Sequence, residues 1–330
     1  MKPFRYEQAQ DAASAVALVS QAEHAGYLAG GTNLVDHLKL GVSQPELLVD
    51  ITRLPYDRIE ALPDGGVRIG ALVRNSDLAA DLLIREKFPF LAQALLAGAS
   101  GQIRNQATIG GNLLQRTRCV YFQDVTKPCN KREPGSGCPA REGYHRSMAI
   151  LGTSEACIAT NPSDMAVPLA ALGASVHVLG PQGERDISLL DLYRLPGAEP
   201  QRDTVLEHGE LITAIEVPGL PFAVNSRYRK VRDRASYAFA LVSLAAAIDV
   251  DRGVIRDVRL AFGGLATIPW RAHKAEAVLR GAPATEASFV QAAEAELADA
   301  QPLHENAFKI QLAHNILVRT LQELVEGSNS

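Results

Sequence analysis

This 330-residue sequence has neither a strong excess of charge nor a long hydrophobic run. The formal net charge of −4 argues against nucleic acid as the main partner, because a phosphate-binding surface needs a basic excess. No apolar run approaches the roughly 20 residues that span a bilayer. The opening stretch MKPFRYEQAQDAASAV has no apolar core of the secretory kind, so we expect no export signal in this chain. The remaining composition is typical of a soluble globular protein with room for two or three compact units.

Cysteine is scarce and unevenly distributed. The sequence has four cysteines, all in one Pro/Gly-broken stretch, at Cys119, Cys129, Cys138 and Cys157. Two disulfides are one interpretation, but a chain of this length has little need of them, and we favour a metal or cluster site. The spacing C-x9-C-x8-C-x18-C contains no C-x2-C pair. It therefore matches neither zinc knuckles nor ferredoxins, and suits a cluster held by a long insertion.

Positive charge is concentrated around these cysteines. From Arg116 to Arg146 there are seven basic residues and three acidic ones, in a chain whose net charge is negative. An iron–sulfur core with four thiolate ligands is negatively charged, so a cationic loop would stabilise it. Disulfides would need no such charge.

The sequence has no G-x-G-x-x-G motif, so a Rossmann-type nicotinamide site has no support. It has instead two Gly-Gly turns flanked by Thr and Asn, at residues 30–33 and 108–112. Backbone N–H groups in such turns can surround a phosphate, and Thr32 and Asn33 can cap a following helix; the alternative is a plain tight turn. A third segment, residues 161–164, opens a further helix. There Asp164 either caps the helix or accepts a hydrogen bond from a sugar-like hydroxyl.

The order of apolar patterns predicts a mixed α/β region followed by a different C-terminal region. Helical spacing is present at residues 11–22, 34–41 and 75–99, the last as one or two helices, with strands at 47–51 and 65–73. Loop-like composition near residues 218–225 predicts a domain boundary. Beyond it we expect antiparallel strands within 237–264 and helices at 274–299 and 306–326.

Four motifs occur in a fixed order: AGGTNL, TIGGNL, the Ser163-Asp164 pair and GGLATIPWR. Together they resemble the FAD-binding medium subunits of the xanthine dehydrogenase and aldehyde oxidase family of molybdenum hydroxylases. The resemblance covers essentially the whole chain. Within the family it is closest to the flavin and [4Fe–4S] subunits of the bacterial periplasmic aldehyde oxidoreductase type, including RTRCVYF and the cysteine loop.

The resemblance implies an α+β fold. A two-part α/β FAD-binding domain of the PCMH/VAO type would span residues 1–222, with a [4Fe–4S] insertion at about 115–157. An antiparallel sheet with helices would form the C-terminal domain, residues 223–330. It also implies FAD-contacting residues, namely Leu28, Ala29, Gly30, Gly31, Thr32, Asn33, Leu34, Thr108, Gly111, Asn112 and Asp164. Lys230, with Arg232 and Tyr237, lies in the segment that closes over the flavin in relatives; a surface salt bridge is the alternative for Lys230.

The resemblance further implies an electron-transfer role without catalytic residues in this chain. Cys119, Cys129, Cys138 and Cys157 would hold a [4Fe–4S] cluster beside FAD. An aldehyde would be oxidised to a carboxylic acid at a molybdenum cofactor on a large partner subunit. Electrons would then reach FAD through [2Fe–2S] centres on a small subunit.

We expect a heterotrimer that is exported folded to the periplasm through a twin-arginine signal on the small partner, and a cytoplasmic complex if that inference fails. The alternatives are a stand-alone flavin oxidase with two disulfides and a non-catalytic zinc scaffold. The histidines are scattered, and we expect His24, His37 and His145 to be surface or capping residues.

Overall fold

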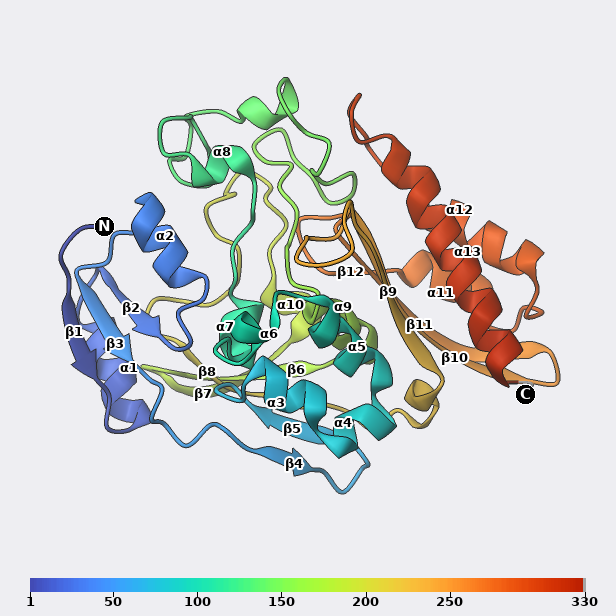
Figure 1. The fold of residues 1–330 in the computed structure, drawn as a ribbon, viewed down its shortest axis with the longest axis horizontal. Coiled ribbons are helices and arrows are strands. Elements are labelled where there is room, and N and C mark those ends of the chain that lie inside the picture. Colours follow the sequence, from blue (N-terminus) through green and yellow to red (C-terminus); the bar gives the residue numbers. More distant parts are fainter. Residues whose placement is uncertain (329–330) are drawn as a thin grey trace.

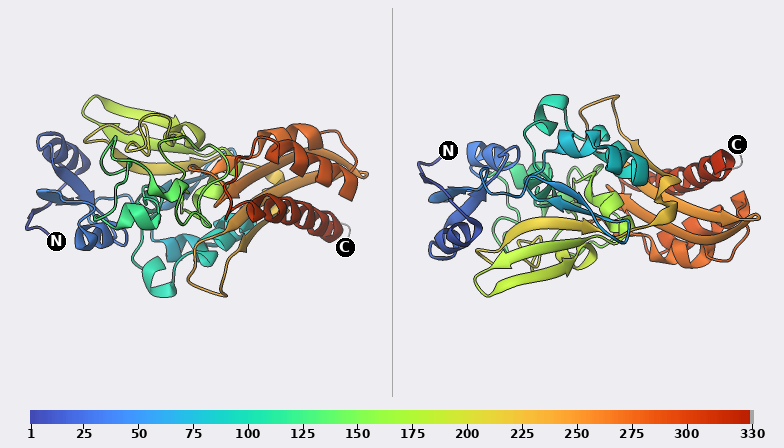
Figure 2. Two further views of the ribbon diagram at one scale, coloured as in Figure 1. Left: turned by 90° about the horizontal axis from the view of Figure 1, so that it is seen from above. Right: turned by 90° about the horizontal axis from the view of Figure 1, so that it is seen from below.

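The structure, a computed structural model, describes residues 1–328 and contains three sheets arranged along its long axis (Figures 1 and 2). The N-terminal sheet lies at one end, and the C-terminal sheet with its helices lies at the other (Figure 2). No helix among residues 1–328 has the length and apolar character needed to cross a membrane.

The N-terminal sheet is parallel, in the order β1-β3-β2. Its elements are β1 (Arg5–Gln8), α1 (Ala12–Ser20), β2 (Ala25–Leu28), α2 (Leu34–Leu40) and β3 (Leu47–Asp50). The predicted start of α1 is confirmed: the Asp11 carboxylate accepts a hydrogen bond from the Ser14 N–H at 2.7 Å. α2 ends at Gly41, whose φ of 74° favours glycine. β3 is central and fully buried, as its continuous apolar sequence predicts.

The second sheet has five strands in the order β4-β5-β8-β6-β7, all paired antiparallel. Its strands are β4 (Ile59–Ala61), β5 (Val67–Gly70), β6 (Ser175–Gly180), β7 (Gly183–Ser188) and β8 (Leu211–Val217). The associated helices are α3 (Asn75–Ala80), α4 (Leu82–Lys87), α5 (Pro89–Ala97), α6 (Gly101–Arg104), α7 (Ile109–Leu113), α9 (Ala166–Leu172) and α10 (Leu189–Leu192). The main hydrophobic core lies between this sheet and its helices.

Residues 75–99 form three helices where the sequence predicts one or two. A new helix, α4, begins after Asp81, whose side chain accepts a hydrogen bond from the Ile84 N–H at 3.1 Å and so caps the helix. The next helix, α5, begins at Pro89, and proline is a favoured first residue of a helix. Local capping chemistry therefore divides a stretch whose apolar spacing is nearly continuous.

The third sheet is antiparallel, in the order β12-β11-β10-β9. Of the three C-terminal helices, the first and the last pack on the sheet, and the middle one packs against the other two. Its elements are η2 (Pro221–Val224), β9 (Ser226–Val231), β10 (Val242–Asp251), β11 (Val254–Gly263), β12 (Trp270–Arg271), α11 (His273–Leu279), α12 (Glu286–Leu297) and α13 (Phe308–Ser328). β8 ends at Val217 and β9 begins at Ser226, so the expected boundary after residue 222 falls between two sheets. The α+β fold class predicted from the sequence is confirmed.

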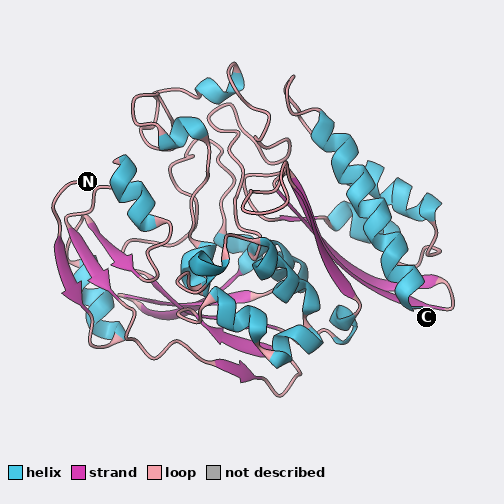
Figure 3. Cartoon of the chain, in the orientation of Figure 1, coloured by secondary structure: helices cyan, strands magenta, loops and turns pink. Residues whose placement is uncertain are grey.

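The segment from residue 115 to residue 157 is almost entirely loop (Figure 3). It contains only α8 (Val120–Gln123) and η1 (Pro139–Arg141). Figure 1 shows it between α2 and the start of α13. Cys119, Cys129, Cys157 and Phe122 form a separate small core there, against which Val42 and Leu303 pack.

Candidate functional site

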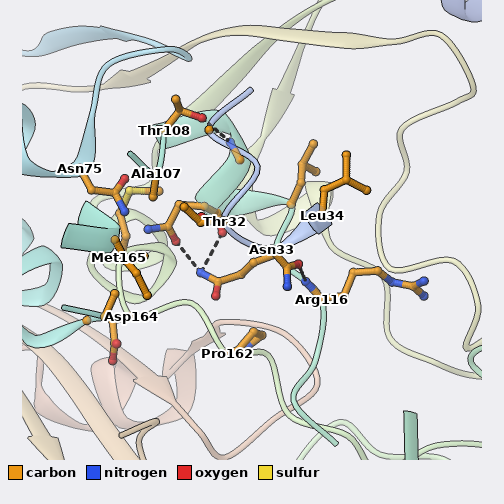
Figure 4. Close-up of a pocket in the computed structure, with 18 of the residues that line it drawn as sticks. Thr32, Asn33, Leu34, Asn75, Ala107, Thr108, Arg116, Pro162, Asp164 and Met165 are labelled. Atoms are coloured by element: carbon orange, nitrogen blue, oxygen red, sulfur yellow. Dashed lines mark hydrogen bonds between the residues drawn. The ribbon is translucent and has the colours of Figure 1, made fainter. Parts of the chain in front are cut away.

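A cavity of about 860 Å³ lies between the N-terminal sheet, the helices of the second sheet and the C-terminal sheet. Figure 4 shows three of its segments, around Asn33, Thr108 and Asp164. Its lining comes mainly from residues 27–37, 71–75, 94–99, 107–118, 162–165, 210–212 and 230–241. Segments far apart in the sequence therefore border one space, large enough for an extended ligand.

The first Gly-Gly turn connects β2 to α2 and borders the cavity. Gly31 has a φ of 71°, and a Cβ on Gly30 would lie 2.1 Å from the carbonyl oxygen of Gln106. Only glycine at position 30 lets this turn lie directly against the backbone that precedes the second turn. Of the predicted residues, Ala29 to Leu34 line the cavity, and Leu28 is the last residue of β2, paired with Asp50.

Asn33 precedes α2, but its side chain does not cap the helix as we expected. Its Oδ1 accepts a hydrogen bond from the backbone N–H of Arg116 at 3.0 Å. The expected cap is therefore wrong for Asn33, because this carbonyl oxygen has a tertiary partner and joins the first turn to the start of the cysteine loop.

The second Gly-Gly pair lies within α7 and not in a turn before it, because Thr108 already caps this helix. The start of α7 is tied to the third segment. Thr108 Oγ1 accepts a hydrogen bond from the Gly111 N–H at 3.4 Å. Asn112 Oδ1 accepts one from the Ser163 hydroxyl at 2.7 Å. Thr108, Gly111, Asn112 and Asp164 all line the cavity.

Ser163, and not Asp164, caps α9: its Oγ accepts a hydrogen bond from the Ala166 N–H at 3.0 Å. The Asp164 carboxylate is therefore free of helix capping. It accepts a hydrogen bond from the Tyr228 hydroxyl at 2.5 Å and pairs with Lys230 at 2.8 Å. Burial, and then the Asp164 charge, raise the pKa of Tyr228 well above its usual value.

Lys230 lines the cavity in a buried ion pair, with 4% of its side chain exposed, so a surface salt bridge is the wrong interpretation. Its ammonium also donates to the Ala97 carbonyl at 3.1 Å, as does Arg232 at 3.2 Å. Our sequence analysis missed Tyr228. Tyr228 and Lys230 share one face of β9, but the sequence of this strand has too few apolar residues to predict a strand from it.

Residues 233–241 form one wall of the cavity, including Tyr237, which has a φ of 51° and is 56% exposed. Arg118 also lines the cavity, beside Phe239. Our sequence analysis did not identify Arg118 as a cavity residue. The Arg118 guanidinium stacks on the Phe239 ring at 5.3 Å. Its buried Nε has no hydrogen-bond partner among residues 1–328. A cation in this cavity that forms no ion pair within the described part of the chain is suited to bind a phosphate group.

The four cysteines border one small pocket, and none forms a disulfide. Cys119, Cys129 and Cys157 are buried, and Cys138 is partly exposed. Burial raises the pKa of the Cys119 thiol to about 11, and backbone hydrogen bonds from Phe122 and Tyr121 oppose this rise. Within the described part of the chain, no group of three or more His, Cys, Asp or Glu side chains is arranged to hold a metal ion.

Backbone N–H groups are directed at three of the four sulfur atoms. The Ala159 N–H donates to Cys157 Sγ at 3.5 Å. Backbone groups of Ile158, Ala140 and Arg141 lower the pKa of Cys138 against the larger effect of burial, which raises it. Such N–H···S contacts are typical of the environment of iron–sulfur clusters.

Several basic residues of this loop bind groups within the loop itself. Arg132 donates to the carbonyl groups of Tyr121 and Phe122, both at 2.6 Å. Arg141 pairs with Glu155 at 2.9 Å. Lys131 is the basic residue that lines the cysteine pocket. The positive charge of the loop therefore organises its backbone, and only part of it faces the cysteines.

Two of the three histidines expected at the surface or in caps are buried. The His37 ring packs edge-on against Phe122, with ring centroids 5.7 Å apart. Burial, and then Arg116 and Arg118, lower the pKa of His37 to about 4. His145 Nε2 accepts a hydrogen bond from the Glu305 N–H at 3.0 Å, which ties the cysteine loop to the segment before α13.

Comparisons of the sequence and of the structure with known proteins match the same family over nearly the whole chain. Residues 2–220 match the FAD binding domain in molybdopterin dehydrogenase, and residues 226–324 match the CO dehydrogenase flavoprotein C-terminal domain. The chain is 50% identical to the aldehyde oxidoreductase FAD-binding subunit PaoB of Escherichia coli K12, over 98% of each chain. It is 30% identical to the glyceraldehyde dehydrogenase medium chain of Sulfolobus acidocaldarius, over 83% of this chain and 79% of that one. CO dehydrogenase from Oligotropha carboxidovorans superposes over 97% of both chains, with a TM-score of 0.76 and 25% identity.

Proposed function

The chain belongs to the FAD-binding medium subunits of the molybdenum hydroxylase family, and from this premise we propose its function in full. We propose that it is the FAD- and [4Fe–4S]-carrying electron-transfer subunit of a heterotrimeric, molybdenum-dependent aldehyde oxidoreductase. Its partners would be a large molybdenum-cofactor subunit, which holds the aldehyde, and a small [2Fe–2S] subunit. The likeness over nearly the whole length of an aldehyde oxidoreductase subunit supports this assignment.

The observation that carries the proposal is the single cavity bordered by both Gly-Gly turns, Asp164 and Lys230. The residues present fit FAD. Gly30 and Gly31 bring backbone N–H groups to the cavity, Arg118 supplies a cation for the pyrophosphate, and the Asp164 carboxylate can accept a hydrogen bond from a hydroxyl. FAD, when bound, accepts electrons singly and releases them in pairs.

The cysteine pocket supports the cluster part of the proposal. Four thiols without disulfides border it, and backbone N–H groups face three of the four sulfur atoms. The four cysteines lie far apart in the sequence and include no C-x2-C pair, which favours a cluster held by a long insertion over a structural zinc ion.

We propose the periplasm as the location, with export of the folded complex through a signal on the small partner. The basis for this proposal is the resemblance of the motifs and of the cysteine loop to those of the periplasmic aldehyde oxidoreductase type. Cluster insertion in the reducing cytoplasm before export would also keep the four thiols from forming disulfides.

The visible spectrum and iron content of the purified protein test the function. We expect broad brown absorption that bleaches on reduction, superimposed on the flavin bands, with four irons per chain. A yellow protein without iron would reject the cluster and leave a simple flavoprotein. A colourless protein would reject both cofactors.

A further inference from the structure

The flavin cavity and the cysteine pocket share one wall. Along residues 116–119 the side chains alternate between the two spaces. Arg116 and Arg118 line the cavity, whereas Thr117 and Cys119 line the pocket. A single stretch of backbone therefore separates the two sites.

Phe122 fills this wall. It is fully buried and borders the cysteine pocket. The Arg116 guanidinium carbon lies 4.6 Å from the centre of its ring, and His37 packs edge-on against it at 5.7 Å. Both of these side chains line the cavity. The wall is thus packed with protein atoms, and charges act more strongly across such a medium than across water.

One carboxylate joins a cation from each side of the wall. Asp203 Oδ2 lies 2.7 Å from Arg116 Nε in the cavity wall, and its Oδ1 pairs with the Lys131 ammonium in the pocket wall. Lys131 also donates to the Pro200 carbonyl at 2.7 Å. Burial raises the pKa of Asp203, but the two cations outweigh this effect and hold the pKa below its usual value.

We propose that Asp203 is a positioning residue that couples the two cofactor sites. Its carboxylate holds Arg116 and Lys131 in place and sets the electrostatic potential on both sides of the wall. The inference rests on the proposed function, because it presumes FAD in the cavity and a cluster in the pocket. Each cofactor becomes more negative on reduction. Removal of the Asp203 charge would therefore favour the reduced form of both.

The test is Asp203→Asn in the full-length protein purified with its cofactors. The flavin potential is followed by spectroelectrochemistry, and the cluster potential by electron paramagnetic resonance. We expect both midpoint potentials to shift upward. The matched control is Asp299→Asn, which neutralises an exposed carboxylate that is paired with Lys274 and lines neither the cavity nor the pocket, and it should move neither potential. Unchanged potentials in Asp203→Asn, or a shift at only one cofactor, would overturn the proposal.

Two cation variants provide a test of opposite sign. Arg116→Gln should lower the flavin potential and Lys131→Gln should lower the cluster potential. They decide the question if Asp203→Asn fails to retain its cofactors. A general loosening of the fold would not shift the midpoint potentials upward in the anion variant and downward in the cation variants. An upward shift of the potentials in both cation variants would therefore contradict the inference. If the wild-type protein proves to lack iron, the cluster part of the proposed function fails and the coupling fails with it, whereas unchanged potentials in a protein that holds both cofactors would overturn the coupling alone.

Discussion

The ammonium of Lys230 lies 2.8 Å from Oδ2 of Asp164, 66 positions away in the sequence. Their side chains are 4% and 10% exposed, so water screens the pair only weakly. The contact joins β9 of the C-terminal sheet to the segment that opens α9. It therefore fixes the third sheet against the flavin cavity.

Replacement of Asp164 by Ala should destabilise the folded protein, because it leaves Lys230 and the Tyr228 hydroxyl without their shared partner. We expect the free energy of unfolding, measured by chemical denaturation of the FAD-free protein, to fall by about 3–5 kcal/mol. Asp299→Ala removes an exposed partner of Lys274 and should cost at most about 1 kcal/mol. Equal, small effects of the two variants would contradict a structural role for the buried pair.

Gly30→Ala should disrupt the contact between the two glycine turns. Its Cβ would lie 2.1 Å from the Gln106 carbonyl oxygen, so the backbone must move, at a cost of about 1–3 kcal/mol. FAD retention, measured by flavin absorbance after gel filtration, should fall sharply. Gly26→Ala in β2 is the control, because its Cβ would meet nothing within 4 Å. The prediction is wrong if both variants retain FAD equally.

Arg118→Gln should weaken FAD binding while leaving the fold intact, because the guanidinium forms no ion pair with residues 1–328 and its Nε has no hydrogen-bond partner there. Loss of one charge-assisted hydrogen bond corresponds to about a tenfold rise in the dissociation constant, measured by flavin fluorescence. Arg319→Gln, on the exposed face of α13, should leave the constant unchanged. An unchanged constant in Arg118→Gln would place the phosphate elsewhere.

Cys129→Ser should lose iron first and retain FAD at least in part, because the cysteine pocket and the flavin cavity are separate spaces. Iron analysis and flavin absorbance of the same sample measure the two effects. Ser136→Ala is a close control: it removes the hydroxyl oxygen that accepts the Cys129 N–H at 2.9 Å and leaves the thiol in place. Full iron content in Cys129→Ser would remove this residue from the ligand set.

Lys309 should make stability depend on pH. Its buried ammonium donates to the carbonyls of Ser147, Met148 and Gly264, and burial, with Arg146 nearby, lowers its pKa from 10.5 to about 7. Between these values the unfolded chain holds a proton that the folded chain has released. Stability should therefore rise from pH 7 toward pH 10, by at most about 1.4 kcal/mol per pH unit, with no contribution to the slope below pH 7.

The measurement is the unfolding free energy of wild type and Lys309→Met across this pH range. The difference between the two curves isolates Lys309 from the cysteines and tyrosines that titrate in the same window. Parallel curves would show that Lys309 keeps its proton throughout.

Several elements could be predicted because their causes are local. α1 begins where Asp11 can cap it, and α2 ends where Gly41 adopts a positive φ. The expected single helix of residues 274–299 divides into α11 and α12, because Gly281, with a φ of 79°, and Pro283 interrupt it. β9 escaped prediction, since its alternating sequence SRYRKV carries too few apolar residues to distinguish it from a loop.

By itself, the amino-acid sequence determined the glycine turns, the clustering of cysteines and basic residues, and the order of motifs that identifies the family. These depend on neighbouring residues, whose conformational preferences act over a few bonds. The partners of the site residues were decided by the tertiary structure alone. Asn112 meets Ser163 across 51 positions, Asp164 meets Lys230 across 66, and Arg116 meets Asp203 across 87. Such pairs form only when sheets and helices pack, because burial strengthens an ion pair that water would otherwise screen.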